Sequence, residues 1–145
     1  MIESIVVGTD GSPTAEQAVE RAAGLGKALG ARVHLVSAYE PSSVRVAGGG
    51  EAARGELLIG PGVTVESVLE QAAGALRVKG VEVELYARKG DPAEAILDVV
   101  QEVGADLVIV GSKGMRGTRR FLLGSVPNKV SHHAPCDVMI VRTGR

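Results

Sequence analysis

Short aliphatic segments alternate with longer amphipathic segments along this chain, and that alternation limits the folds that it can adopt. Four of the short segments are nearly unbroken runs of β-branched or aliphatic residues, at 5–7, 33–36, 107–110 and 138–141. Such runs are typical of parallel strands that are buried on both faces. A fifth segment, 81–85, alternates apolar and acidic residues, which predicts a strand with one face in water. We therefore expect four inner strands and one more exposed strand.

Helical segments lie between these strands, and residues that favour helix ends mark several of their boundaries. Ser12 and Pro13 predict the start of a helix that ends at Gly30, because serine caps helix starts, proline suits the first turn and glycine ends helices. The other helices are expected at about 63–79, 91–104 and 125–133. The resulting order is β-α-β-loop-α-β-α-β-loop-α-β. It predicts an α/β protein with a parallel sheet and helices on both faces.

Composition bounds the organisation of the chain and the functions open to it. A length of 145 residues suits one domain, 1–145, and an apolar content of 45% excludes intrinsic disorder. The formal net charge of −1 predicts no general attraction to nucleic acid or to an anionic membrane. The single cysteine, Cys136, excludes an internal disulfide. Without a signal peptide or an apolar run near ~20 residues, the expected location is the cytoplasm.

Two connections are longer than the roughly two to six residues that usually join a strand to a helix. Residues 41–61 predict a mobile surface loop, since they contain three consecutive glycines and little periodicity. Residues 111–124 follow the most apolar strand and combine four glycines with Lys113, Arg116, Arg119 and Arg120. Glycine lets backbone amides turn toward an anion, and the start of the next helix adds further amides. We interpret this segment as a phosphate-binding loop; the alternative is a tight glycine turn with solvated basic side chains.

The spacing Gly111-x2-Gly114-x9-Gly124-Ser125 matches the ATP-binding signature of the universal stress protein family. The opening VVGTDGS, at 6–12, resembles that family's first strand and turn, and the closing PCDVMIVR, at 135–142, resembles its last strand. The resemblance covers essentially the whole chain and is to single-domain members of the ATP-binding branch. It implies an adenine nucleotide alpha hydrolase-like fold, an open five-stranded parallel sheet in the order 3-2-1-4-5.

The resemblance also implies a nucleotide site. Asp10 matches the acidic residue that approaches the ribose or a phosphate-bound metal, and Ala38 matches the position whose backbone reads the adenine edge. Asp10 has an alternative interpretation as a helix cap, although Ser12 already supplies a cap there. The remaining candidate contacts are Gly8 and Thr9 beside the adenosine, and Val110, Gly111, Gly114, Arg116, Gly124, Ser125 and Val126 around the phosphates.

The implied ligand is ATP with Mg²⁺, with cyclic AMP as the alternative because some family members prefer it. Asp10 is expected near the nucleotide-bound Mg²⁺, and no metal site made of protein side chains alone is expected. Family members are commonly homodimers joined through the last strand, here Val138 to Val141. No nucleophile and base can be paired from the sequence, so a regulatory protein of the stress response with little or no hydrolysis is expected. A weak ATP-hydrolysing enzyme is the alternative from another class.

Overall fold

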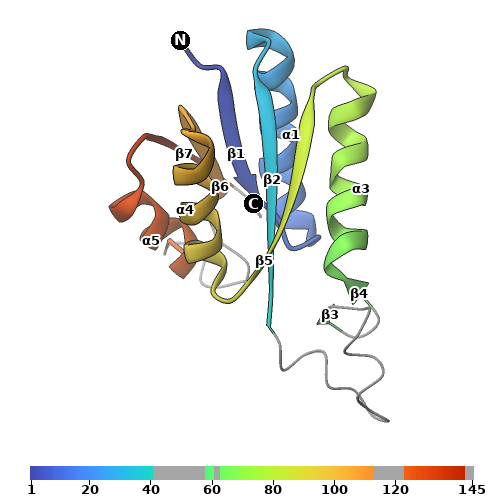
Figure 1. Cartoon of the computed structure of the whole chain (residues 1–145), viewed down its shortest axis with the longest axis vertical. Coiled ribbons are helices and arrows are strands. Elements are labelled where there is room, and N and C mark those ends of the chain that lie inside the picture. Colours follow the sequence, from blue (N-terminus) through green and yellow to red (C-terminus); the bar gives the residue numbers. More distant parts are fainter. Residues whose placement is uncertain (41–57, 61–62, 113–122, 143–145) are drawn as a thin grey trace.

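The structure is a computed structural model that describes residues 1–40, 58–60, 63–112 and 123–142. Its centre is a five-stranded parallel sheet (Figure 1). The strands lie side by side in the order β5 (Val83–Lys89), β2 (Arg32–Tyr39), β1 (Ser4–Gly8), β6 (Leu107–Gly111) and β7 (Asp137–Val141). This arrangement confirms the predicted order 3-2-1-4-5.

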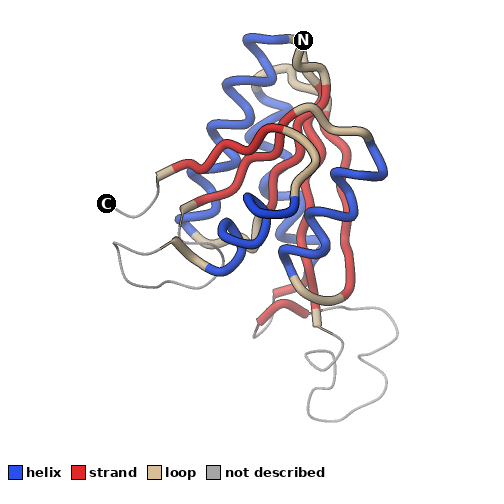
Figure 2. The backbone as a smooth tube through the Cα atoms, turned by 90° about the vertical axis from the view of Figure 1, so that its left-hand side faces the viewer, coloured by secondary structure: helices blue, strands red, loops and turns tan. Residues whose placement is uncertain are grey.

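Helices cover both faces of this sheet, as Figure 2 shows. One face carries α1 (Pro13–Leu29) and α3 (Val65–Val78), and the other carries α4 (Pro92–Val103) and α5 (Ser125–His133). Successive residues of β1 serve opposite faces, because Ile5 packs with the α1 and α3 cluster while Val6 packs with the α4 and α5 cluster. Both-face burial explains the continuous aliphatic run in this strand. No helix in the described part of the chain is long and apolar enough to cross a membrane.

The residues that marked helix ends in the sequence do so in the structure. The hydroxyl of Ser12 caps α1, and the carboxylate of Asp91 caps α4 by accepting a hydrogen bond from the Glu94 amide at 3.0 Å. Gly30 and Gly104 end these two helices in the left-handed conformation, with φ of 67° and 63°. The predicted boundaries of α1 and α4 are therefore confirmed.

The strand predicted at 81–85 lies further along the chain, over Val83–Lys89. The reason is the way α3 ends. Gly80 adopts a φ of 80°, and the Val81 amide donates a hydrogen bond back to the carbonyl of Leu76 at 3.1 Å. This bond keeps Val81 in the turn that closes the helix, so the strand begins two residues later.

The segment 41–61 was predicted to lack regular structure, and this is wrong for its last residues. Leu58–Gly60 forms β3, which pairs antiparallel with β4 (Val63–Thr64). The helix predicted at about 63–79 is present as α3 and begins two residues later, because Val63–Thr64 belongs to β4 and the Thr64 hydroxyl caps α3 by accepting from Ser67 at 3.1 Å. Residues 41–57 lie outside the described residues.

Three strands, not four, are inner strands. β7 is an edge strand, and Ile140 within it is 38% exposed. Its apolar run is explained by its two faces: Met139 packs against the α1 side of the sheet and Val138 against the α5 side. An aliphatic run indicates that both faces of a strand are covered by other elements. It does not indicate whether the strand has a neighbouring strand on each side.

Candidate functional site

The carboxyl ends of β1 and β6 lie next to each other, at the point where the strand order reverses. The β1–β6 pairing runs up to Val7 and Ile109. From there β1 leads into α1 on one face and β6 leads toward α5 on the other. In open parallel sheets, ligands bind beyond the carboxyl ends of strands at such a reversal. This edge is therefore the candidate site.

The turn after β1 brings Thr9 and Asp10 to this edge and holds them with side-chain hydrogen bonds. Thr9 is 1% exposed, its amide donates to the Val36 carbonyl at 2.9 Å, and its hydroxyl accepts from the Gly11 amide at 3.1 Å. One carboxylate oxygen of Asp10 accepts from the Ser12 amide at 2.9 Å. The other oxygen has no hydrogen bond to any described residue. Asp10 thus stabilises the turn, Ser12 caps the helix, and one carboxylate oxygen stays available.

β2 extends beyond the end of β1, and this overhang places Ala38 at the site. The last β1–β2 pair is Gly8 with Val36, whereas β2 stays paired to β5 as far as Tyr39. The Val36 carbonyl bonds to the β1 side and the Tyr39 carbonyl to the β5 side. Because backbone groups alternate in direction along a parallel strand, those of Ala38 face the β1 side, where β1 has already ended. The backbone N–H and C=O of Ala38 are therefore free of strand pairing on that side and can form hydrogen bonds with a ligand.

The loop between β6 and α5 is closed at its base by hydrogen bonds. The Ser112 amide donates to the Val141 carbonyl at 2.8 Å, and the Gly124 amide donates to the Ser112 carbonyl at 2.9 Å. Gly111, paired with Val141, ends β6 immediately before this closure, and Val110 beside it is buried. Gly124 therefore closes the loop with its amide. The predicted site residues Gly114 and Arg116 lie outside the described residues.

The start of α5 differs from the starts of α1, α3 and α4 because, within the residues that the structure describes, no side chain caps it. Its N-cap residue is Gly124, whose carbonyl accepts the first helical bond from Asn128 at 3.0 Å. The amides of Ser125 and Val126 meet no hydrogen-bond acceptor in the part of the chain that the structure describes, and Pro127 has no amide hydrogen. Two unpaired amides at the positive end of a helix dipole can hold an anion.

The structure thus gathers most of the predicted residues at one edge: Gly8, Thr9, Asp10, Ala38, Val110, Gly111, Gly124, Ser125 and Val126. Two contributors were missed. Gly11 adopts a φ of 83° and shapes the turn that carries Asp10, and the backbone of Ser112 closes the loop. The Asp-Gly pair at 10–11 is a turn signal that could have revealed Gly11. Backbone closure by Ser112 has no signal in the sequence.

The fold and this edge define an α/β protein with an open five-stranded parallel sheet and a candidate ligand site at the carboxyl ends of its strands. The chain belongs to the universal stress protein family, whose family model matches residues 1–142. A putative universal stress protein of Staphylococcus aureus (strain USA300) is 33% identical over 150 residues, covering 97% of this chain and 84% of that protein. Universal stress protein YxiE of Bacillus subtilis (strain 168) is 43% identical over 75 residues, which are 52% of this chain and 51% of that protein.

Two solved structures with similar folds contain adenine nucleotides. A universal stress protein in complex with cAMP is 30% identical, with a TM-score of 0.75 and coverage of 99% of this chain and 98% of that one. The universal stress protein from Archaeoglobus fulgidus in complex with dAMP is 26% identical, with a TM-score of 0.67 and coverage of 97% and 98%. These similarities extend over nearly the whole of each chain.

Proposed function

We propose that this chain binds ATP with Mg²⁺ at the carboxyl edge of its sheet and acts as a nucleotide-dependent regulatory protein of the stress response, in the cytoplasm. The observation that carries this proposal is the start of α5, where no described side chain caps the helix and the amides of Ser125 and Val126 meet no acceptor among the described residues. These amides follow a loop with the glycine spacing of the ATP-binding members of the family. The cAMP and dAMP in the two similar structures support an adenine nucleotide as the ligand class.

Each part of the edge has a role in this proposal. The amides of Ser125 and Val126 hold phosphate oxygens, and the exposed Ser125 hydroxyl is a further donor. The second carboxylate oxygen of Asp10 accepts from a ribose hydroxyl or holds Mg²⁺ through water. The backbone of Ala38 recognises the adenine edge. The Mg²⁺ supplies charge neutralisation for the phosphates.

The proposal assigns little or no hydrolysis to this site. One carboxylate oxygen of Asp10 already accepts a hydrogen bond from the Ser12 amide, so that oxygen is engaged in holding the turn. A general base must also lie within hydrogen-bond reach of the proton that it removes. Occupancy of the site, rather than turnover, is then the signal. A hydrolysis rate far above that of free ATP would contradict this part of the proposal.

Cyclic AMP is the second candidate ligand, because a structure 30% identical to this chain holds it. A cyclic phosphate offers a single phosphate group to the helix start. It therefore depends less on the loop between β6 and α5 than a triphosphate does. The two candidate ligands can be distinguished by how strongly their affinities change when the start of α5 is altered.

Substitutions at Ser125 test the phosphate site without disturbing the helix. Proline is tolerated at the first helical position, and Gly124 before it has an extended conformation, with φ of −68° and ψ of 169°. Ser125→Pro removes one amide hydrogen and the hydroxyl, whereas Ser125→Ala removes only the hydroxyl. We expect Ser125→Pro to weaken Mg-ATP binding by about tenfold or more, and more than Ser125→Ala does.

The measurement is calorimetric titration of nucleotide-stripped protein with Mg-ATP and, separately, with cyclic AMP. If only cyclic AMP binds to the wild-type chain, the ligand assignment changes. If neither binds, the proposed function is wrong. If Mg-ATP binds and Ser125→Pro binds it equally well, the start of α5 is not the phosphate site.

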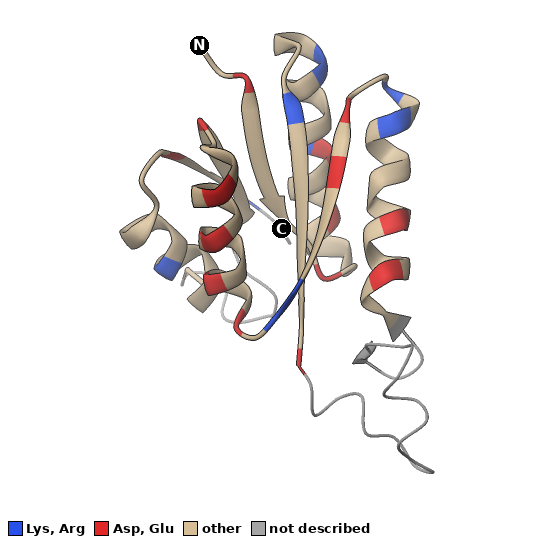
Figure 3. Cartoon of the chain, in the orientation of Figure 1, with Lys and Arg blue, Asp and Glu red and all other residues tan. Residues whose placement is uncertain are grey.

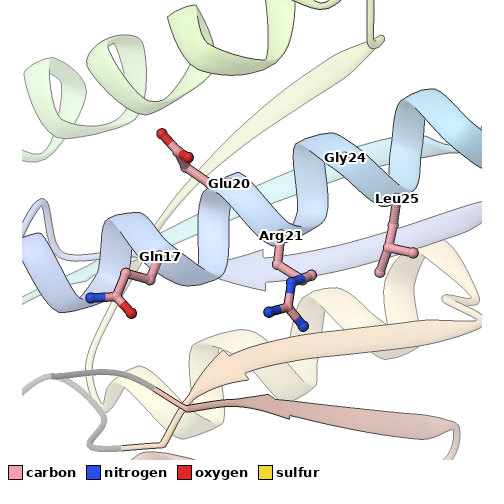
Figure 4. Close-up of a pocket in the computed structure, with 5 residues that line it drawn as sticks. All are labelled: Gln17, Glu20, Arg21, Gly24 and Leu25. Atoms are coloured by element: carbon pink, nitrogen blue, oxygen red, sulfur yellow. The ribbon is translucent and has the colours of Figure 1, made fainter. Parts of the chain in front are cut away.

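We also propose that two copies pair through β7, so that each completes the other's sheet. Ile140 on this edge is 38% exposed, and Asp137 at the start of the strand is its single charged residue. A long apolar edge without protection favours pairing with another chain. A surface depression of about 460 Å³ lies along α1 and is lined by Gln17, Glu20, Arg21, Gly24 and Leu25; Figure 4 shows Gln17, Arg21 and Leu25 on the side opposite Glu20. In this proposal the second copy covers that side of α1.

The opposite edge of the sheet is protected. Figure 3 shows charged segments along β5. Arg32 forms ion pairs with Glu82 at 2.9 Å and Glu84 at 3.3 Å, and Arg88 pairs with Glu102 at 2.6 Å. Charged side chains along an edge strand disfavour the approach of another strand. The contrast supports β7, rather than β5, as the pairing edge.

A further inference from the structure

The turn that carries Asp10 packs directly against α3. Gly11 in this turn has a φ of +83°, a conformation that favours glycine. A β-carbon built on Gly11 would lie 3.2 Å from Cγ2 and 3.5 Å from Cγ1 of Val68, and its three nearest heavy atoms all belong to that side chain. The side chain of Val68 therefore packs beneath the backbone of the turn at Gly11.

Val68 is well suited to fix the position of this turn. It is 6% exposed on the apolar face of α3, at the fourth residue of the helix, and a β-branched side chain in a helix has one strongly preferred rotamer. Next to it lies a cavity of about 110 Å³ between α1 and α3, lined in part by Thr9, Gly11, Val19 and Ala72. Without the γ-methyl groups of Val68, the turn would have open space on this side.

A shift of Gly11 toward that space would change the geometry of the two hydrogen bonds that hold the turn, one of which ends on the Asp10 carboxylate. The Gly11 amide donates to the Thr9 hydroxyl, and the neighbouring Ser12 amide donates to the Asp10 carboxylate. Thr9 itself is anchored to β2 through the Val36 carbonyl, so we expect a shift of Gly11 to turn the following residues about that anchor. The direction of the free carboxylate oxygen of Asp10 then depends on the Val68 side chain beneath Gly11.

We propose that Val68 is a positioning residue for Asp10: its side chain supports the left-handed Gly11 and thereby sets the direction in which the Asp10 carboxylate meets the nucleotide. This inference rests on the proposed function, because Asp10 is taken as a ligand contact. It makes α3 part of the binding machinery, although Val68 contacts no ligand.

A double-mutant cycle between Val68→Ala and Asp10→Asn tests this inference by titration with Mg-ATP. Val68→Ala is expected to weaken binding by about tenfold, the size of one weakened hydrogen bond to a charged group. In the Asp10→Asn background the same substitution is expected to have little further effect, since its influence passes through Asp10. A residue with a merely structural role would give equal losses in both backgrounds.

Two matched variants accompany the cycle. Val68→Ile keeps both γ-carbons, and its added methyl group points to a neighbourhood with spare volume, so binding is expected to stay within about twofold of wild type. Val65→Ala removes the same atoms from another buried position on α3. We expect it to lower stability without the loss of affinity that Val68→Ala causes, as read from chemical denaturation alongside titration.

The outcomes separate this inference from the proposed function. If the wild-type chain binds no adenine nucleotide, the proposed function fails. If the wild type binds and the losses from Val68→Ala and Asp10→Asn simply add, Val68 does not act through Asp10 and the inference is wrong. It is also overturned if Val65→Ala weakens binding as much as Val68→Ala does, or if Asp10→Asn leaves affinity unchanged.

Discussion

The hydroxyl oxygen of Tyr86 lies 2.9 Å from Nδ1 of His34, across the pairing of β2 with β5. The Tyr86 hydroxyl donates its single hydrogen to the carboxylate of Glu84 at 2.9 Å. The imidazole nitrogen must therefore be the donor in its contact with Tyr86, which assigns the neutral tautomer with hydrogen on Nδ1. Burial, followed by the hydrogen bond to Glu84, raises the pKa of Tyr86 to about 12. The hydroxyl thus stays protonated throughout the physiological range.

The burial of His34 predicts that stability falls as the solution is acidified. Burial lowers the pKa of His34 below its ordinary 6.5, although Glu84 opposes the shift. Below pH 6.5 the imidazole of His34 becomes protonated in the unfolded chain, whereas in the folded chain it is protonated only at a lower pH. The contribution of His34 is thus fully present above pH 6.5 and is lost as the pH falls toward its folded pKa, with a slope of at most about 1.4 kcal/mol per pH unit.

Urea denaturation at several pH values between neutral and mildly acidic measures this loss. His34→Gln, which keeps an amide donor for Tyr86 and cannot titrate, is expected to flatten the pH dependence. The control is His133→Gln, at an exposed position at the end of α5. If the His34 and His133 variants change the pH profile equally, the buried imidazole is not its source.

Two glycines of α1 are expected to respond to alanine with opposite signs. A β-carbon on Gly24 would have no atom within 4 Å, so Gly24→Ala gains helix propensity and should stabilise the protein by about 0.5–1 kcal/mol. A β-carbon on Gly26 would lie 3.0 Å from Val81 and 3.1 Å from Val33, so Gly26→Ala should destabilise by about 1–3 kcal/mol. Chemical denaturation measures both, and equal signs would contradict the packing of α1 described above.

Two buried serine hydroxyls, those of Ser4 and Ser37, have no hydrogen-bond partner among the described residues. Replacing either by alanine loses no hydrogen bond and removes a buried polar group. We expect unfolding free energies within about 0.5 kcal/mol of wild type or slightly higher. Ser12→Ala provides the contrast, because its hydroxyl caps α1, and should cost about 1 kcal/mol. A loss at Ser4 or Ser37 as large as that at Ser12 would point to a bound water.

Pairing through β7 predicts that one charged residue on that edge separates the copies. Ile140→Lys places an ammonium group on the apolar edge, and its mass by sedimentation should be half that of the wild type. Leu29→Lys is the control, because Leu29 is 46% exposed at the end of α1 in the part of the molecule where the strands begin. A monomeric wild-type chain would rule out the proposed pairing.

The sequence predicts those parts of the fold that depend on local chemistry. Ser12 and Asp91 start their helices and Gly104 ends one, because capping needs only the residues beside it. The start of β5 was misplaced because it depends on a bond from Val81 back to Leu76, which residue types do not reveal. β3 escaped prediction because three residues carry too little periodicity.

The candidate site also has parts that the sequence predicts and parts that only the folded structure reveals. The glycine spacing and the resemblance of the first strand and turn to the family are visible in the sequence, and they lead to Ser125 and Asp10. The overhang of β2 that turns the backbone of Ala38 toward the site depends on the relative lengths of two strands. The contact between Gly11 and Val68 joins residues 57 positions apart, so only the folded chain reveals it.

The unequal edges of the sheet have a consequence for how far assembly can proceed. If β7 of one copy paired with β5 of the next, each addition would expose a fresh β7 and the product would be an open filament. Such growth must bring a strand beside the ion pairs of Arg32 and Arg88, and they disfavour it. Pairing of β7 with β7 about a twofold axis leaves only charged edges exposed, and so it closes after two copies.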